Sequence, residues 1–239
     1  MAKRRVVLTG AAGYVGQRMF AELSERWDLV PIDVSPTTRD GRAAPGLIVS
    51  DLTVRDRDRY RQHFHGADAV IHLGYVRAPG LDATTWQNNS DAKFWAEHEN
   101  VAMAYNVYRV ALEEGVRRVV VCSSNHAADY YERLVWDGRV DMVTPEMPPR
   151  SDNWYGWSKA AYELLGFVFA TGKVDGRKLE VVQWRIGARA TTTWTTWRRA
   201  TSRSCIGRSA PISRGAIRSS RPSAWWRPPT SPTSTACRS

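Results

Sequence analysis

Residues Val6 to Gly16, Val-Val-Leu-Thr-Gly-Ala-Ala-Gly-Tyr-Val-Gly, decide the fold of this chain. Three apolar, β-favouring residues run into a glycine-rich turn, and an amphipathic segment follows at once. The stretch therefore predicts a strand, a tight turn and a helix. Glycine lets a ligand approach the backbone closely, and the start of a helix offers free N–H groups to phosphate. A turn without a ligand would use glycine too, so this stretch alone leaves a nucleotide site and a structural turn equally open.

The composition suits a single large domain. The 239 residues can bury one sizeable core, and no apolar run is long enough for a transmembrane helix. Three cysteines, Cys122, Cys205 and Cys237, have no paired spacing, which argues against a disulfide or zinc framework. We therefore expect a cytoplasmic protein with neither a metal nor a membrane partner.

The net charge of +10 arises at one end of the chain. All 24 acidic residues and 24 of the 34 basic residues precede residue 189, so residues 1–188 carry no net charge. Residues 189–239 hold ten arginines and no Asp, Glu, Lys, Leu or Val. A basic chain suggests a nucleic-acid partner. Here that interpretation rests on residues 189–239 alone, and we expect no such partner.

We predict that residues 189–239 are an out-of-frame reading. Their Arg, Ser, Thr and Pro content could bury little surface and would leave them disordered. With suitable degenerate bases, a one-base shift turns Thr191–Thr201 into Asp-Asp-Asp-Val-Asp-Asp-Val-Glu-Ala-Gly-Asp. We therefore expect a cofactor-binding catalytic domain at 1–188 and a C-terminal substrate part that is missing or scrambled.

Strand and helix patterns alternate through the rest of the chain. The expected strands after the first are Leu29–Val34, Leu47–Leu52, Ala67–Gly74, Arg118–Ser124 and 179–186. Helices are expected at 55–65, within 83–115 and from Tyr155 onwards. This alternation predicts an α/β fold, a doubly wound parallel sheet with helices on both faces. Ligands of such sheets bind at the carboxyl ends of strands, where Gly10, Asp33, Asp51, His72 and Ser124 all fall.

Asp33 ends the second strand, 23 residues after Gly10. An acid there can accept both ribose hydroxyls of an adenosine. It would also repel a 2′-phosphate, because like charges ~4 Å apart cost roughly 4 kcal/mol at an effective dielectric near 20. The position predicts NAD rather than NADP, with Arg39 and Arg42 nearby as the counter-indication. His72 is interpreted as a hydrogen-bonded structural histidine, with a catalytic base as the alternative.

Tyr155 and Lys159 are four residues apart at the start of an expected helix, so they share one helical face. A nearby ammonium lowers the pKa of a phenol, ordinarily near 10, and makes the phenol a better base. Ser124 can hydrogen-bond the same substrate oxygen. Such a pair alone is commonly structural. Combined with the glycine turn and Asp33, it predicts that Ser124, Tyr155 and Lys159 are catalytic.

Over about residues 5–187 these motifs resemble the extended short-chain dehydrogenase/reductase family, the NAD-dependent epimerases and dehydratases. The residues that carry the resemblance are Thr9–Gly16, Asp33, Asp51-Leu52, His72–Gly74, Asn100, Ser123-Ser124 and Tyr155-x-x-x-Lys159. Ser123–His126 and Arg185–Gly187 resemble the uronate dehydrogenase and NAD-dependent sugar dehydrogenase branch.

The resemblance implies a set of contacts. It assigns NAD to Gly10, Ala12, Gly13, Tyr14, Val15, Gly16, Asp33, Asp51, Leu52, Leu73, Gly74, Asn100, Tyr155 and Lys159. It assigns the substrate to Arg77, Ser124, Asn125 and His126. Two departures from that branch are the loop at 127–153, which separates Ser124 from Tyr155, and Arg77, where the branch has a small hydroxyl residue. A solvated loop arginine is an equal interpretation of Arg77.

The implied reaction is hydride transfer from a sugar or sugar-acid hydroxyl carbon to NAD, with Tyr155 as the base. Two alternatives stay open: a nucleotide-sugar epimerase or dehydratase that recycles its NAD, and a non-catalytic NAD-binding protein. A homodimer is expected where the full domain is present. The resemblance does not identify the sugar.

Overall fold

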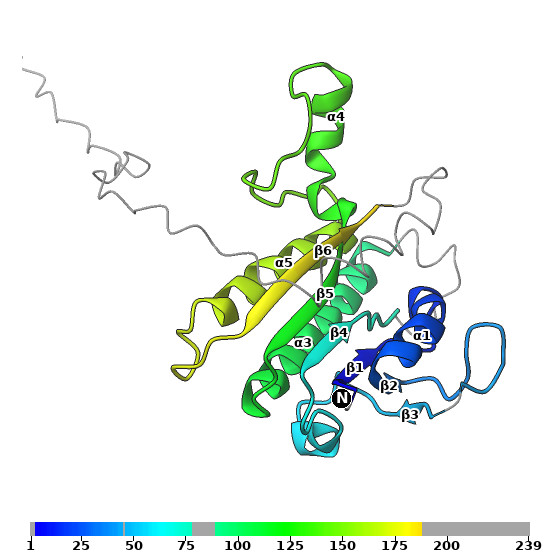
Figure 1. Ribbon diagram of the computed structural model, residues 1–239. Coiled ribbons are helices and arrows are strands. Elements are labelled where there is room, and N and C mark those ends of the chain that lie inside the picture. The colour runs from blue at the N-terminus through cyan, green and yellow to red at the C-terminus, as the bar shows by residue number, and fades with distance from the viewer. Residues whose placement is uncertain (1–2, 45, 78–88, 188–239) are drawn as a thin grey trace, which may run out of the picture.

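A computed structural model describes residues 3–44, 46–77 and 89–187 of the chain. Six strands form one parallel sheet in the order β3-β2-β1-β4-β5-β6 (Figure 1). The strands are β1 (Arg5–Thr9), β2 (Asp28–Asp33), β3 (Ile48–Val49), β4 (Ala69–His72), β5 (Arg118–Ser124) and β6 (Glu180–Ile186). The order reverses between β1 and β4, which confirms the predicted doubly wound sheet and places a crevice at that point.

Helices cover both faces of the sheet (Figure 1). The helices are α1 (Tyr14–Arg26), α3 (Ser90–Glu113), α4 (Tyr130–Trp136), α5 (Trp154–Ala170) and the 3₁₀ turns η1 (Arg57–Arg59), η2 (Arg61–His63) and η3 (Asn125–Ala128). Successive residues of a strand point to opposite faces. Val7 accordingly joins the core beneath α3 and α5, whereas Val6 and Leu8 join the core beneath α1. Burial on both faces explains the continuous apolar runs of the central strands.

The structure corrects three expectations about single elements. β3 is two residues long, because the Asp51 carboxylate accepts the Thr53 N–H and turns the chain away. The charged segment at 55–65 forms η1 and η2 rather than one helix, with Asp56 capping the first. The expected loop at 127–153 contains the end of η3 and all of α4, and the Tyr131 hydroxyl donates a hydrogen bond to the Pro148 carbonyl, which holds α4 in place.

The predictions made for residues 83–88 and for the out-of-frame segment at 189–239 lie outside the described residues.

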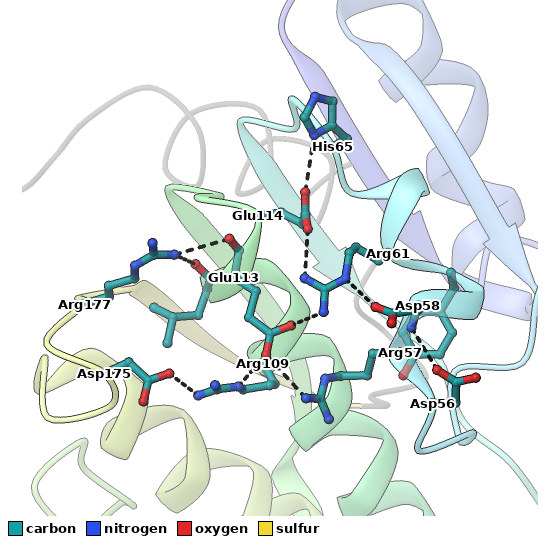
Figure 2. A network of polar contacts seen from close by, with 12 residues as sticks. Asp56, Arg57, Asp58, Arg61, His65, Arg109, Glu113, Glu114, Asp175 and Arg177 are labelled. Atoms are coloured by element: carbon teal, nitrogen blue, oxygen red, sulfur yellow. Dashed lines mark hydrogen bonds and ion pairs between the residues drawn. The ribbon is translucent and has the colours of Figure 1, made fainter.

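A network of ion pairs joins the end of α3 to η1 and η2 (Figure 2). The Glu113 carboxylate accepts hydrogen bonds from Arg57 at 3.3 Å, Arg61 at 2.7 Å and Arg109 at 2.6 Å. Arg61 also donates to Glu114 at 3.1 Å. The network lies at the end of the sheet where the strands begin, which is the end opposite their carboxyl ends.

Glu113→Gln is expected to lower the free energy of unfolding by about 1–2 kcal/mol, because three guanidinium groups lose their shared carboxylate. Burial raises the pKa of Glu113, but the hydrogen bond from Arg109 and the neighbouring guanidinium charges outweigh burial and hold the pKa below its ordinary value. The stabilisation is therefore complete above the ordinary carboxyl pKa and is lost as the pH falls through the lowered value.

Urea unfolding at neutral pH and at pH 3 measures both effects of Glu113. The control is Glu22→Gln, which removes a carboxylate that pairs with the exposed Arg26 at 3.4 Å. We expect the control to change stability by less than about 0.5 kcal/mol. A Glu113 variant that unfolds at the same urea concentration as its parent at both pH values would contradict the prediction.

Candidate functional site

A cleft of about 1280 Å³ opens at the carboxyl ends of the strands. Ligand pockets for drug-sized molecules occupy about 300–1000 Å³, so this cleft has room for a ligand larger than a drug-sized molecule. Every predicted site residue except Asn100 lines it. The sheet thus brings the glycine turn, the second-strand acid and the Ser, Tyr and Lys side chains to one cavity.

The turn between β1 and α1 accepts only glycine at two positions. Gly10 has a φ of +70°, and a Cβ there would lie 2.6 Å from the Leu73 carbonyl carbon. A Cβ on Gly16 would fall on the Gly10 carbonyl oxygen and lie 2.7 Å from that of Ala11. Gly13 caps α1 without a side chain, so the first N–H groups of α1 have no side-chain cap. This geometry suits a phosphate group.

Asp33 lies directly beside the glycine turn. Its carboxylate accepts the Ala12 N–H at 2.9 Å and the Ser35 N–H at 3.0 Å. These bonds fix the carboxylate at the cleft wall and leave lone pairs for two further donors. Asp51 and Leu52 line the same wall, and the buried Asn106 amide of α3 holds the Leu52 carbonyl at 2.9 Å. Asn106 is a supporting residue that the sequence patterns did not indicate.

Asn100 lies behind the cleft rather than in its wall. It is fully buried, accepts the Val76 N–H at 2.7 Å and donates to the Val76 carbonyl at 2.8 Å. Asn100 therefore holds the segment that follows β4 in position. The neighbouring wall residues Leu73 and Gly74 continue from β4, where the Leu73 N–H donates to the Thr9 carbonyl at 3.1 Å.

His72 is also buried, and its Nδ1 lies 2.7 Å from the Thr9 hydroxyl. Burial lowers the pKa of His72 to about 3, so the ring is neutral at physiological pH. His72 does not line the cleft. These facts favour the structural interpretation of His72 over the catalytic one.

Tyr155 and Lys159 both lie on α5, and Ser124 ends β5 opposite them. The Lys159 Nζ is 5.6 Å from the centre of the Tyr155 ring. Burial raises the pKa of Tyr155, and a hydrogen bond with Ser124 lowers it by less. The expectation of a lowered phenol pKa is therefore wrong, because the loss of solvation outweighs the Ser124 hydrogen bond and the Glu97 charge raises the pKa of Tyr155 further.

His126 faces the same phenol. Its ring lies edge-on to Tyr155 with the centres 5.5 Å apart, and its Nδ1 is 2.6 Å from the Asp129 carboxylate. Asn153, which caps α5, donates to the same carboxylate at 2.8 Å. Asp129 and Asn153 therefore orient His126, and neither was expected from the sequence. Asn125 lines the cleft beside them.

Two cationic side chains line the cleft, Arg77 and Lys93 of α3. Their positive charge suits an anionic group on a ligand.

Glu97 is a further cleft residue that the sequence interpretation missed. Its side chain is 1% exposed, and it hydrogen-bonds Tyr75 and Ser158. A signal was present, because Glu97 shares a helical face with Asn100 and Ala104, where an acid is out of place among buried residues.

Among the described residues, no cluster of His, Cys, Asp and Glu side chains could hold a metal ion. In the same part of the chain, no helix combines the length and apolar character needed to cross a bilayer.

A doubly wound parallel sheet with a glycine turn at its switch point defines the Rossmann-like class of folds. Within that class, the chain belongs to the NAD dependent epimerase/dehydratase family, whose family model matches residues 6–171.

Characterised relatives are sugar and sugar-acid dehydrogenases. The chain is 35% identical to an L-arabinose 1-dehydrogenase (NAD(P)(+)) of Haloferax volcanii over 191 residues, which cover 77% of this chain and 66% of the relative. It is 30% identical to a uronate dehydrogenase of Pseudomonas putida over 186 residues, which cover 77% of this chain and 60% of the relative. The chain thus spans less than two thirds of the length of these two relatives.

Solved structures agree with the sequence matches. A glucuronic acid dehydrogenase from Chromohalobacter salexigens is 28% identical, with a TM-score of 0.57 over 78% of this chain and 61% of that one. A structure titled MoeE5 in complex with UDP-glucose and NAD is 25% identical, with a TM-score of 0.55 over 76% of this chain and 53% of that one.

Proposed function

We propose that this chain carries the cofactor-binding and catalytic part of an NAD-dependent dehydrogenase that oxidises a sugar or sugar acid in the cytoplasm. The observation that carries the proposal is the meeting of Ser124, Tyr155 and Lys159 with the glycine turn and Asp33 in one cleft. The names of the relatives support the same reaction class.

The cleft fits NAD on three independent grounds. A Cβ at Gly10 or Gly16 would collide with backbone, as expected for a turn packed closely enough to cradle a pyrophosphate. The start of α1 offers N–H groups that no side chain caps. Asp33 is held where it can receive ribose hydroxyls. When bound, NAD supplies the hydride acceptor and, in its oxidised form, a positive charge.

Side chains of the protein supply proton transfer and substrate binding. Tyr155 in its phenolate form takes the proton of the reacting hydroxyl and becomes a neutral phenol, and Ser124 orients that hydroxyl through a hydrogen bond. Lys159 provides the cation that stabilises the phenolate before it accepts this proton. His126, which Asp129 holds edge-on to the Tyr155 ring, contacts the sugar. Arg77 and Lys93 favour a substrate that carries a carboxylate or phosphate.

The formation of NADH tests the proposal. The protein with its reading frame restored past codon 188 is incubated with NAD and, in turn, glucuronate, galacturonate, L-arabinose and glucose 6-phosphate, and absorbance is followed at 340 nm. Steady NADH production with one of these supports a dehydrogenase. Interconversion of a nucleotide sugar without net NADH would establish the epimerase alternative. NAD binding without either reaction would establish a non-catalytic NAD-binding protein.

Asp33→Ala is expected to narrow the preference of the protein for NAD over NADP. The parent should bind NAD at least about tenfold more tightly than NADP, because the Asp33 carboxylate repels a 2′-phosphate. The variant should lose most of that ratio. Titration of the parent and the variant with both nucleotides measures the ratio of NAD to NADP affinity. The matched control is Asp51→Ala, which removes another acid from the same wall and should keep the preference for NAD. A parent that prefers NADP would contradict this assignment, and the name of the arabinose relative, which gives both cofactors, makes the measurement decisive.

We also propose a homodimer that forms through the outer faces of α3 and α5. Five large apolar side chains stay exposed there: Trp95 (56%), Tyr105 (42%), Leu164 (61%), Phe167 (70%) and Val168 (48%). An apolar surface of this kind suits a second copy of the chain, packed helix against helix. Light scattering on the frame-restored protein and on its Phe167→Glu variant tests the assembly, because a charge at this position should yield monomers. A frame-restored protein that is monomeric without the substitution would refute it.

We also propose that a one-base frame change near codon 188 separates the domain at 1–188 from residues 189–239. The composition break and the regrouped codons support this proposal. It predicts negligible sugar turnover until the frame is restored. Sequencing the gene across codon 188 tests it, and the lack of an alternative open frame there would defeat it.

A further inference from the structure

The Glu97 carboxylate bridges two segments of the site. It projects from α3, accepts the Tyr75 hydroxyl at 2.5 Å through one oxygen and is 2.5 Å from the Ser158 hydroxyl through the other. Ser158 precedes Lys159 on α5, and Tyr75 belongs to the segment that follows β4. One buried acid thus fastens both segments that hold the Lys159 side chain.

Lys159 is buried in a cage of aromatic rings. It is 5% exposed, and its Nζ lies 4.3 Å from the Tyr162 ring centre, 5.4 Å from that of Tyr75 and 5.6 Å from that of Tyr155. Among the described residues it forms no ion pair within salt-bridge distance. The titratable groups that face it are Tyr75, Tyr155, Tyr162, Glu97, His72 and Cys122.

Of these six groups, Glu97 is the carboxylic acid. His72 is neutral, and tyrosines and cysteine are ordinarily uncharged at neutral pH. A buried ammonium without an opposite charge is costly, and so is a buried carboxylate, whereas each offsets the cost of the other.

We infer that Glu97 is the internal counter-charge of Lys159 and a positioning residue for the Tyr155–Lys159 pair. The inference rests on the proposed function, which makes that pair catalytic. Glu97 acts through Lys159, because it keeps the ammonium charged inside the protein. It also acts through Tyr75, whose ring lies edge-on to Tyr155 with the centres 5.6 Å apart.

The titration of Lys159 agrees with this geometry. Burial lowers the pKa of Lys159 to about 8, and two negative charges oppose that change: the charge that Cys122 carries when its thiol is ionised, and the charge of the Glu97 carboxylate. Glu97 also raises the pKa of Tyr155. Loss of the Glu97 charge therefore makes proton release from the pair easier, whichever of the two groups gives up the proton.

Lysine NMR on the full chain tests the inference without any substrate. The chain contains five lysines, at positions 3, 93, 159, 173 and 178, so labelling at ¹³Cε gives few signals. The signal that Lys159→Arg removes is that of Lys159. We expect Glu97→Gln to lower the pKa of Lys159 by about one unit, which is roughly a tenfold weaker hold on the proton.

Three further variants separate charge from packing. Glu97→Met, an apolar side chain of similar length, should shift the Lys159 pKa in the same direction as Glu97→Gln. Tyr75→Phe keeps the charge and the ring, so its shift should be under about a third of that seen in Glu97→Gln. Glu99→Gln, which removes an exposed acid two residues along α3, should leave Lys159 unchanged.

A Lys159 pKa that is the same in the parent, Glu97→Gln and Glu97→Met would overturn the inference, because Glu97 would then be uncharged or too well screened. An equal shift in Tyr75→Phe would overturn it too, since packing would explain the result. Failure of the proposed function looks different: the parent would not bind NAD, while the Lys159 titration would still respond to Glu97.

Discussion

Replacing Tyr155 by phenylalanine is expected to reduce kcat for sugar oxidation by about 10²–10⁴-fold, the usual contribution of a positioned general base. NAD affinity should stay within about twofold, because the variant keeps the aromatic ring and loses only the proton acceptor. Stopped-flow or steady-state NADH formation gives kcat, and calorimetry gives the affinity. Where the parent chain shows no turnover, both are measured after the reading frame is restored.

The control for Tyr155→Phe is Tyr105→Phe, an exposed tyrosine on α3 outside the cleft, which should behave like the parent. If Tyr155→Phe retained activity within a few-fold, the base would lie elsewhere. His126, bonded to Asp129 and facing the same cavity, would then be the next group to replace.

Gly156→Ala is expected to damage the site from within the helix that carries Tyr155. A Cβ at this position would lie 2.7 Å from the His126 carbonyl carbon and would collide with the Ser151 hydroxyl. In an uncrowded helix, alanine would stabilise by about 1 kcal/mol relative to glycine. The collision reverses the sign, and we expect a net loss of about 1–3 kcal/mol because α5 must move away from η3.

Urea unfolding measures the stability of Gly156→Ala, and NADH formation measures its activity. Because α5 would move relative to Ser124, activity should fall further than stability explains, while the glycine turn continues to bind NAD. The control is Ala161→Gly on the same helix, which measures the difference in helix propensity between alanine and glycine alone. A Gly156→Ala protein more stable than its parent would show that the helix has room for the methyl group.

The sequence predicted the parts of the fold that depend on local pattern. The predicted strand Arg118–Ser124 is the strand β5 residue for residue, because the apolar run at its centre suits a strand buried on both faces of the sheet. Gly10 and Asp33 were placed correctly at the cleft, since consecutive parallel strands bring their carboxyl ends to one edge.

The remaining features depend on contacts between distant segments. Asn100 turns its amide to the Val76 backbone, and Glu97 meets Tyr75 and Ser158, neither of which lies near it in sequence. The pKa of Tyr155 depends on how deeply α5 packs, which no spacing of residues reports. Local pattern located the site, and tertiary packing determines the charge state of its groups.

We propose that the cleft between β1, β2 and β4 is the NAD site of a sugar dehydrogenase. Calorimetric titration of NAD into the protein is the direct test, because the residues that we propose to bind NAD all precede residue 188. We expect saturable binding of one NAD for each chain, at least about tenfold tighter than NADP. No binding of NAD at millimolar concentration, or tighter binding of NADP, would contradict the assignment of this cleft to NAD.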